Sequence, residues 1–161
     1  MSVLAVKVEL AEAWKADGGA AFKNKDYRRA TAAYKQALAV LNCPDGCELA
    51  ADEYESIRRL LAVLHVNLAA CCLQEKTSFA ANECEKHCTE ALRHDESNVK
   101  AWFRRYQAHV RSGDLEKAKH DIHHAVEREP TNPTLRKELA RVLELLAAQT
   151  SAQKKLYSRA F

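Results

Sequence analysis

Residues 11–41 read AEAWKADGGAAFKNKDYRRATAAYKQALAVL, and this stretch decides the fold. It is rich in Ala, the strongest helix former, and it contains small residues that would let two helices approach closely, at Gly18 and Ala30. Aromatic side chains can fill the gaps beside them. The stretch therefore predicts two closely packed helices joined by a tight turn near Tyr27.

Two later segments of the chain repeat a similar pattern at a constant offset of 34 residues from each other. The aligned positions are Cys84, Cys88, Ala91 and Leu92 with Ala118, Ile122, Ala125 and Val126. A period of about 34 residues is typical of the helix–turn–helix unit of tetratricopeptide repeats (TPRs). The chain thus resembles the TPR family. The alternative is an unrelated helical bundle with chance periodicity, and three units in register argue against it.

The first unit carries the family's pattern of aromatic and small residues most fully. Its matching positions are Trp14, Gly18, Tyr27, Ala30, Tyr34, Ala37 and Leu38. The third unit matches at Trp102, Ala118, Ile122, Ala125 and Pro130. One position departs from the pattern, because Tyr106 stands where the small residue belongs. This departure predicts local repacking between the two helices of the third unit.

The resemblance implies one all-α domain of seven helices in a right-handed superhelix, made of three TPR units and a capping helix. The expected limits are about 11–41, 59–95 and 98–131 for the repeats, with an insertion at about 42–58 and a capping helix at about 133–158. Residues 48–75 can also form one continuous helix, because apolar residues recur through them at helical spacing. The capping helix carries an apolar stripe at Leu135, Leu139, Val142, Leu143 and Leu146. A terminal repeat needs such a cap over its apolar face.

Composition excludes several functional classes. The 161 residues include only 4 Gly and 3 Pro, so turns are few and long helices are expected. The net charge of +3 is too small for a dedicated nucleic-acid binder. We find no signal peptide, no run of about 18 apolar residues and no glycine-rich phosphate loop. We therefore expect a cytoplasmic, monomeric protein that binds neither membranes nor nucleic acids, is not an enzyme and needs no cofactor.

Six Cys and seven His raise the question of a metal site. Both Cys43/Cys47 and Cys84/Cys88 have C-x-x-x-C spacing, whereas structural zinc sites commonly use C-x-x-C. Core packing explains Cys84 and Cys88, which take the small and medium positions of a helix. No nucleophile accompanies the histidines at 120, 123 and 124. We therefore predict no metal or catalytic site.

The first helix of each TPR unit lines the inner face of the superhelix, where ligands bind. These helices offer Lys15, Asn67, Lys100 and Arg104. This set resembles four of the five positions of the carboxylate clamp of heat-shock co-chaperones, which grips a Glu-Glu-Val-Asp (EEVD) C-terminal tail. Lys and Arg supply charge-assisted donors, and an Asn amide can donate to a carboxylate oxygen.

The fifth clamp position, an Asn in the family, is Gly19 here. A lost hydrogen bond to a charged group costs roughly 1.5–3 kcal/mol, which predicts weaker binding. Phe22, Leu73 and Phe103 are candidate apolar walls for the valine side chain of the tail. The alternative is that the basic residues are ordinary solvated helix charges.

Three features make the resemblance more specific: the long insertion, the run NVKAWFRRYQA at 98–108 and the run QKKLYSRAF at 153–161. Together they resemble the C-terminal domain of large immunophilin co-chaperones. It implies a chaperone of the 90 or 70 kDa class as partner. In that family the C-terminal end can bind calmodulin, although an exposed helix end is the commoner interpretation. No isomerase domain is present, which suits either a free-standing module or a fragment. A scaffold that binds another protein or an internal helix, without a clamp, is the alternative function.

Overall fold

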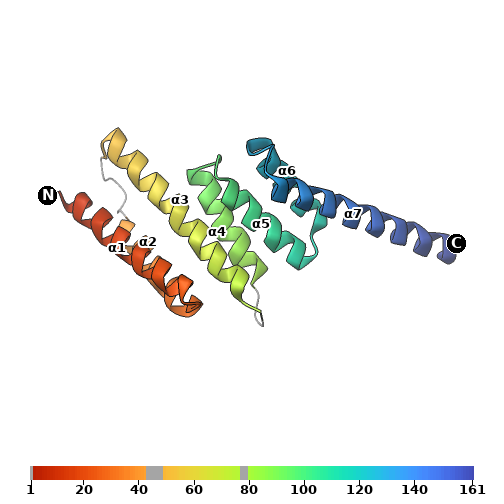
Figure 1. The fold of residues 1–161 in the computed structure, drawn as a ribbon, viewed down its shortest axis with the longest axis horizontal. Coiled ribbons are helices and arrows are strands. Elements are labelled where there is room, and N and C mark those ends of the chain that lie inside the picture. Colours follow the sequence, from red (N-terminus) through yellow and green to blue (C-terminus); the bar gives the residue numbers. More distant parts are fainter. Residues whose placement is uncertain (1, 43–48, 77–79) are drawn as a thin grey trace.

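The computed structural model describes residues 2–42, 49–76 and 80–161, and Figure 1 shows them as a row of helices. The described helices are α1 Val3–Lys23, α2 Tyr27–Leu41, α3 Ala51–Gln74, α4 Ala81–His94, α5 Val99–Ser112, α6 Leu115–Arg128 and α7 Pro133–Ala160. No strand occurs in these residues, and the all-α fold is confirmed. Consecutive helices pack in the pairs α1/α2, α3/α4 and α5/α6. Each pair lies beside the next, as expected of stacked repeats.

The central helix α3 takes part in both ends of the hydrophobic core. Its Leu64 and Leu68 pack in a cluster with residues of α1 and α2, and its Val66 packs in the cluster of α5, α6 and α7. The most apolar part of α3 has the length and composition of a membrane span, but half of it is buried within the domain. The hydropathy of this helix is therefore explained by its central position in the core.

The contact between α1 and α2 depends on Gly18. A Cβ atom added to Gly18 would lie 2.6 Å from Cε1 of the buried Tyr34 ring. The predicted role of this small residue is thus confirmed. Trp14, however, does not fill a gap in the core as its position in the pattern suggested, because it is 36% exposed. Trp102, at the matching position of the third unit, is 6% exposed.

We expect Gly18→Ala to lower the free energy of unfolding by about 1–3 kcal/mol, the usual cost of overpacking a core. The Tyr34 ring must move to admit the new methyl group. Gly19→Ala is the matched control, because its Cβ would have only the Tyr34 hydroxyl, at 4.0 Å, as a neighbour outside α1. Ala is about 1 kcal/mol better than Gly in a helix, so the control should be stabilised. Urea denaturation measures both, and equal stabilities would contradict the prediction.

The bulky Tyr106 of the third unit makes its contacts toward α7. The side chain is buried, its ring stacks on Phe103, and its hydroxyl donates to Glu138 Oε2 at 2.6 Å. Burial and the neighbouring carboxylate raise the pKa of Tyr106. The expected repacking lay between α5 and α6, and the hydrogen bond of Tyr106 adds a contact from α5 to the capping helix.

The capping helix α7 packs along only its first half. Asn132 caps it by accepting from the backbone N–H groups of Thr134 and Leu135, and Leu135 and Val142 are buried. Leu143, expected in the apolar stripe, is instead 42% exposed. Residues 147–160 are exposed throughout, and this end of the helix projects from the domain in Figure 1. The predicted cap is therefore shorter than the helix that carries it.

Two histidines meet between α3 and α4, with the Nδ1 atoms of His65 and His87 3.1 Å apart. Burial, followed by the neighbouring His87 and His94, lowers the pKa of His65 to about 4, and burial lowers the pKa of His87 as well. The folded state therefore holds these rings neutral, while the unfolded chain takes up protons below about pH 6.5.

It follows that the domain should lose stability as the pH falls from 6.5 toward 4. We expect a loss on the order of 1–3 kcal/mol, because the unfolded state binds more protons in this range. Urea denaturation at pH 7.0, 6.0 and 5.0 measures it. The loss should be smaller in His65→Gln, which keeps a polar side chain but does not titrate. A steeper loss in that variant would contradict the prediction.

Candidate functional site

The guanidinium group of Arg104 is the best-positioned basic group on the inner helices. Its Nη1 donates to the backbone oxygen of Val66 at 2.6 Å, which joins α5 to α3. The side chain is half-buried, and this burial lowers the pKa of Arg104. An arginine keeps its charge even so, and its remaining N–H groups can serve a ligand.

Arg104 lines a pocket of about 350 Å³ between α1, α3 and α5. Two other predicted residues line the same pocket, Phe22 from α1 and Leu73 from α3. The pocket also contains Gln107 and Arg111, which we did not predict. Both lie on the face of α5 that carries Arg104, three and seven positions later, so helical spacing could have revealed them. Arg111 donates to the backbone oxygens of Leu73 and Glu75.

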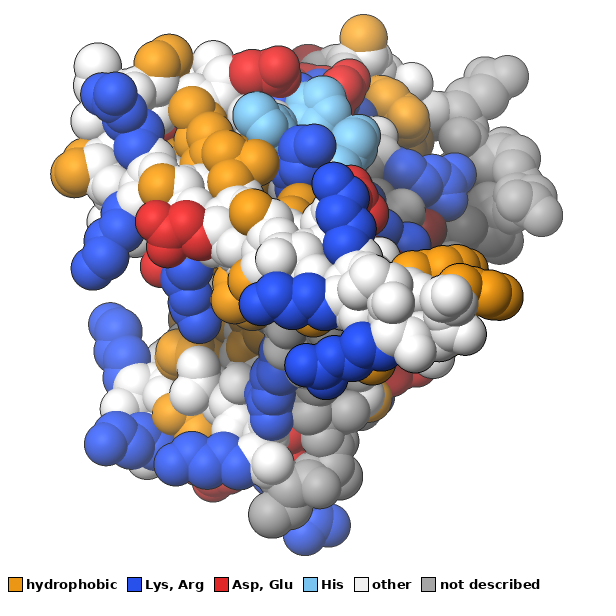
Figure 2. All heavy atoms as spheres, turned by 90° about the vertical axis from the view of Figure 1, so that its right-hand side faces the viewer, with side chains coloured by type: hydrophobic (Ala, Val, Ile, Leu, Met, Phe, Trp, Pro, Cys, Tyr) orange, Lys and Arg blue, Asp and Glu red, His pale blue; other side chains and the backbone are white. Residues whose placement is uncertain are grey.

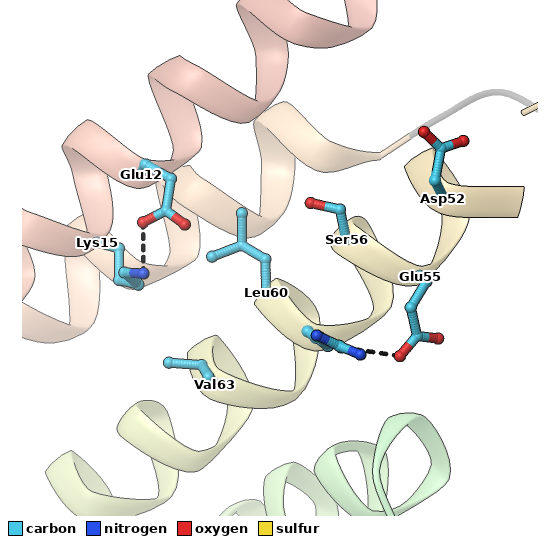
Figure 3. Close-up of a pocket in the computed structure, with 8 residues that line it drawn as sticks. Glu12, Lys15, Asp52, Glu55, Ser56, Leu60 and Val63 are labelled. Atoms are coloured by element: carbon cyan, nitrogen blue, oxygen red, sulfur yellow. Dashed lines mark hydrogen bonds and ion pairs between the residues drawn. The ribbon is translucent and has the colours of Figure 1, made fainter. Parts of the chain in front are cut away.

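Lys15 does not lie in the Arg104 pocket. It forms an ion pair with Glu12 on α1 and lines a separate pocket between α1 and α3 (Figure 3). That pocket contains the carboxylates of Asp52 and Glu55, and an ion pair also joins Glu55 to Arg59. The surroundings of Lys15 are therefore acidic, whereas those of Arg104 are basic.

One face of α3 connects the two pockets. Leu60 and Val63 line the Lys15 pocket, and Ala70 and Gln74 line the Arg104 pocket. The spacing from 63 to 67, 70 and 74 is that of a single helical face, so Asn67 lies between the two pockets. We name this face of α3, with the two pockets at its ends, the α3 groove. Asn67 is half-buried and follows Val66, whose oxygen holds Arg104.

The remaining predicted site residues lie around the α3 groove in different ways. Lys100 is exposed, one helical turn before Arg104 on α5. Gly19 lies one turn after Lys15 on α1, and a side chain there would have ordinary contact distance to Tyr34. Phe103 instead packs against the α5–α7 core, and it is not among the residues of the Arg104 pocket. In the space-filling view, Lys and Arg side chains border a hollow on the face seen from the α7 end (Figure 2).

Four cysteines fall within the described residues, and all have free thiols. Cys84 and Cys88 are fully buried in α4, and Cys84 lies against the backbone oxygen of Ala69. Their predicted role in core packing is confirmed. Cys43 and Cys47 lie outside the described residues.

No protein-family profile matches the chain, but individual proteins and solved structures do. The peptidyl-prolyl cis-trans isomerase FKBP4 of Mus musculus is 31% identical over 157 residues, which are 98% of this chain and 33% of that protein. The chain thus spans about a third of the length of this relative.

Solved structures with the same fold include a TPR domain of an FK506-binding protein and a TPR domain bound to an HSP90 peptide. The C-terminal TPR-containing domain of a Plasmodium falciparum FK506-binding protein has a TM-score of 0.79 at 24% identity, over 90% of this chain and 93% of that one. The first TPR domain of Spaghetti (RPAP3), bound to the HSP90 peptide SRMEEVD, has a TM-score of 0.68 at 27% identity, over 87% and 98%. The chain has the TPR fold and is similar to the C-terminal TPR-containing domain of an FK506-binding protein and to the TPR domains of HSP90 co-chaperones.

Proposed function

We propose that this domain binds the acidic C-terminal tail of a heat-shock chaperone, of the EEVD type, in the α3 groove. The observation that carries the proposal is the position of Arg104, which is held at the Val66 oxygen beside Asn67 and faces a pocket lined by Phe22 and Leu73. Related TPR domains support it: those of RPAP3 are solved with an HSP90 peptide and with an HSP70 peptide. The myosin chaperone UNC-45 is likewise solved with an HSP90 peptide.

Each end of the groove would have its own part in recognition. Arg104 and Lys100 would donate charge-assisted hydrogen bonds to carboxylates of the tail, and the Asn67 amide would add a neutral donor. The apolar surface of Phe22 and Leu73 would take the valine side chain. The carboxylates around Lys15 would repel an acidic ligand, so the terminal carboxylate belongs at the Arg104 end.

The direct test is calorimetry with a peptide that ends in EEVD and with the same peptide amidated at its C-terminus. We expect binding of the free acid and a loss of about tenfold or more on amidation, because a charge-assisted hydrogen bond contributes roughly 1.5–3 kcal/mol. Binding of the acid should also weaken with added salt. Equal affinities for the two peptides would overturn the clamp.

Restoring the missing clamp side chain should strengthen binding. Gly19→Asn adds an amide one turn after Lys15, where the backbone has room for a Cβ atom. One added hydrogen bond to a carboxylate predicts an affinity gain of about threefold to tenfold. Calorimetry with the same peptide measures the gain, and Gly19→Ala separates it from any effect of helix stability. An equal gain in both variants would show that the amide itself contributes nothing.

The alternative function, a TPR scaffold that binds another protein without a clamp, has one observation in its favour. Val3, Val6 and Leu10 are exposed apolar residues of α1 at near-helical spacing, and Trp14 continues the row. Such a stripe suits a partner surface rather than a peptide terminus.

We place the domain in the cytoplasm and assign it no catalytic role, because the chain matches the TPR part of its immunophilin relatives. The calmodulin contact at the exposed end of α7 stays a prediction.

A further inference from the structure

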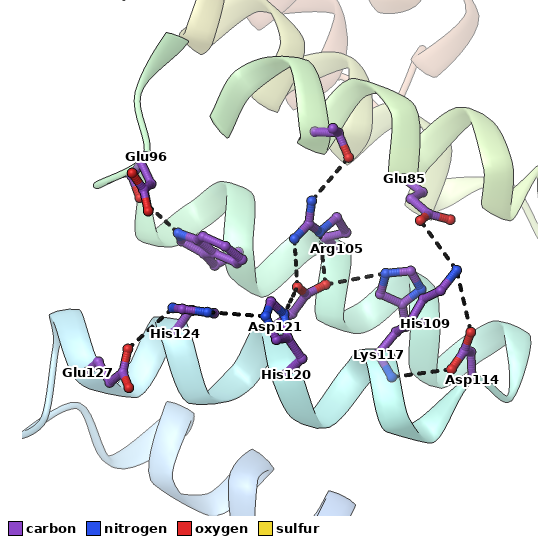
Figure 4. A network of polar contacts seen from close by, with 12 residues as sticks. Glu85, Glu96, Arg105, His109, Asp114, Lys117, His120, Asp121, His124 and Glu127 are labelled. Carbon is purple, nitrogen blue, oxygen red and sulfur yellow. Dashed lines mark hydrogen bonds and ion pairs between the residues drawn. The ribbon is translucent and has the colours of Figure 1, made fainter. Parts of the chain in front are cut away.

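Two histidines of α6 have their Nε2 atoms directed toward each other. His120 and His124 are four residues apart, which puts them on one face of the helix. Their Nε2 atoms lie 3.3 Å apart, and the two rings meet edge to face (Figure 4). The α6 helix lies apart from the α3 groove and contributes no residue to either of its pockets.

The second nitrogen of each ring has a carboxylate beside it. His120 Nδ1 lies 3.3 Å from Asp121 Oδ1, and His124 Nδ1 lies 3.2 Å from Glu127 Oε2. An imidazole that donates its Nδ1–H to a carboxylate leaves the Nε2 lone pair free. The same pairing of carboxylate, imidazole and metal orients histidine ligands in metalloproteins.

Packing holds the His124 ring, and a buried carboxylate orients the His120 ring. His124 stacks on Trp102 with ring centres 4.4 Å apart, and the Trp102 indole donates to the backbone oxygen of Glu96 at 2.8 Å. Asp121, beside His120, is buried and receives two hydrogen bonds from Arg105. The carboxylate that orients His120 is therefore fixed from the core.

We propose that His120 and His124 form a two-histidine site for a divalent transition-metal ion such as Zn²⁺ or Ni²⁺. Two zinc–nitrogen bonds of about 2.0–2.1 Å at a tetrahedral angle place the nitrogen atoms about 3.4 Å apart, close to the distance between these two Nε2 atoms. Two histidines at this spacing on one helix also provide metal ligands in the zinc proteases.

The site would be open on its outer side. No group of three or more His, Cys, Asp or Glu residues in the described part of the chain could hold a metal ion. Two ligands therefore come from this domain, and water or a group from another molecule completes the coordination. Arg128 Nη1 lies 3.4 Å from His124 Nδ1, the nitrogen beside Glu127, and donates to the His124 backbone oxygen. Its positive charge lowers the affinity without blocking Nε2.

Titration with Ni²⁺ alone tests the site by calorimetry, in the wild-type chain and in two single variants. His120→Ala removes one ligand from a side chain that is 62% exposed, and should weaken the binding of one Ni²⁺ per chain by at least tenfold. His123→Ala is the matched control, because this neighbouring histidine is exposed and is not one of the two proposed ligands. It should bind within about twofold of wild type. The buried cysteine thiols are unchanged in all three proteins, so they do not cause a difference in Ni²⁺ binding between them.

A second readout separates metal binding from a simple hydrogen bond between the two rings. Saturating Ni²⁺ should raise the melting temperature of the wild-type chain and of His123→Ala, but not that of His120→Ala. Glu127→Gln, which weakens the support behind His124, should lower affinity by about tenfold. Equal Ni²⁺ binding in wild type and His120→Ala, or no binding of one equivalent by wild type, would overturn the proposal.

Discussion

Replacing Arg104 with Ala should weaken the binding of an EEVD peptide by about two orders of magnitude or more. Truncating one side of an enclosed, hydrogen-bonded charge pair costs about 2–5 kcal/mol, and each 1.4 kcal/mol is a factor of ten in Kd. Arg104 is held in place before the ligand arrives, because it already donates to the Val66 oxygen. A ligand carboxylate would therefore meet an ordered donor, and little side-chain entropy would be lost on binding.

The Arg104 test needs controls for structure, because the same side chain links α5 to α3. Circular dichroism and thermal melting show whether Arg104→Ala remains folded. Arg104→Lys keeps the charge but loses the planar fork, and should fall between wild type and Ala. Lys86→Ala removes an exposed charge from the outer helix α4 and should leave binding unchanged. A folded Arg104→Ala variant with wild-type affinity would exclude the α3 groove as a carboxylate clamp.

The largest effect on stability is expected from Asp121→Ala, with a loss of about 3–5 kcal/mol in the free energy of unfolding. Asp121 is 1% exposed and accepts hydrogen bonds from Arg105 Nη2 at 2.8 Å and Arg105 Nε at 3.0 Å. His109 Nε2 lies 3.3 Å from Asp121 Oδ2, the oxygen that also accepts from Arg105 Nε (Figure 4). Burial by itself would raise the pKa of Asp121, but the hydrogen bonds from His109 and Arg105 lower it. The Ala variant leaves the positive charge of Arg105 enclosed and without its partner.

Urea denaturation in metal-free buffer measures this loss, with Glu116→Ala on the exposed side of α6 as the control. The double variant Arg105→Ala/Asp121→Ala should be more stable than the sum of the two single losses predicts, because it removes the isolated charge as well. Strict additivity, or a loss below about 1 kcal/mol in Asp121→Ala, would show that the pair contributes little.

The local packing of the repeats could be predicted from the sequence, because the TPR pattern describes contacts within one unit. The contact between Gly18 and Tyr34 is an example. The same pattern failed for Trp14, which shares its position with the buried Trp102. The neighbours differ, because within the described residues α1 packs on α2 with a small contact to α3, whereas α5 packs on α3, α4 and α6. The burial of a repeat position thus depends on its neighbours, which the pattern of one unit does not contain.

The candidate site was predictable in part for a related reason. The positions of Asn67 and Arg104 follow from helical register, so the sequence could bring them to one groove. The ion pair between Lys15 and Glu12, and the bond from Arg104 to Val66, depend on side-chain rotamers and on contacts between units. The orientation of the His120 and His124 rings, and so the short distance between their Nε2 atoms, likewise depends on which ring nitrogen lies beside each carboxylate. Sequence spacing indicates which residues share a face, but not where their polar atoms point.

The projecting half of α7 gives the molecule an uneven resistance to local unfolding. Beyond Leu146 the side chains are exposed, so this part of the helix is stabilised by contacts within itself, and a free helical segment of about four turns is marginal in water. Its amides can open one turn at a time at little cost, whereas those of α3 open only when the core around them separates. Amide hydrogen exchange should therefore be fast at the C-terminal end of α7 and slow at its capped beginning. One continuous helix would then contain amides with nearly the lowest and nearly the highest protection from exchange in the domain.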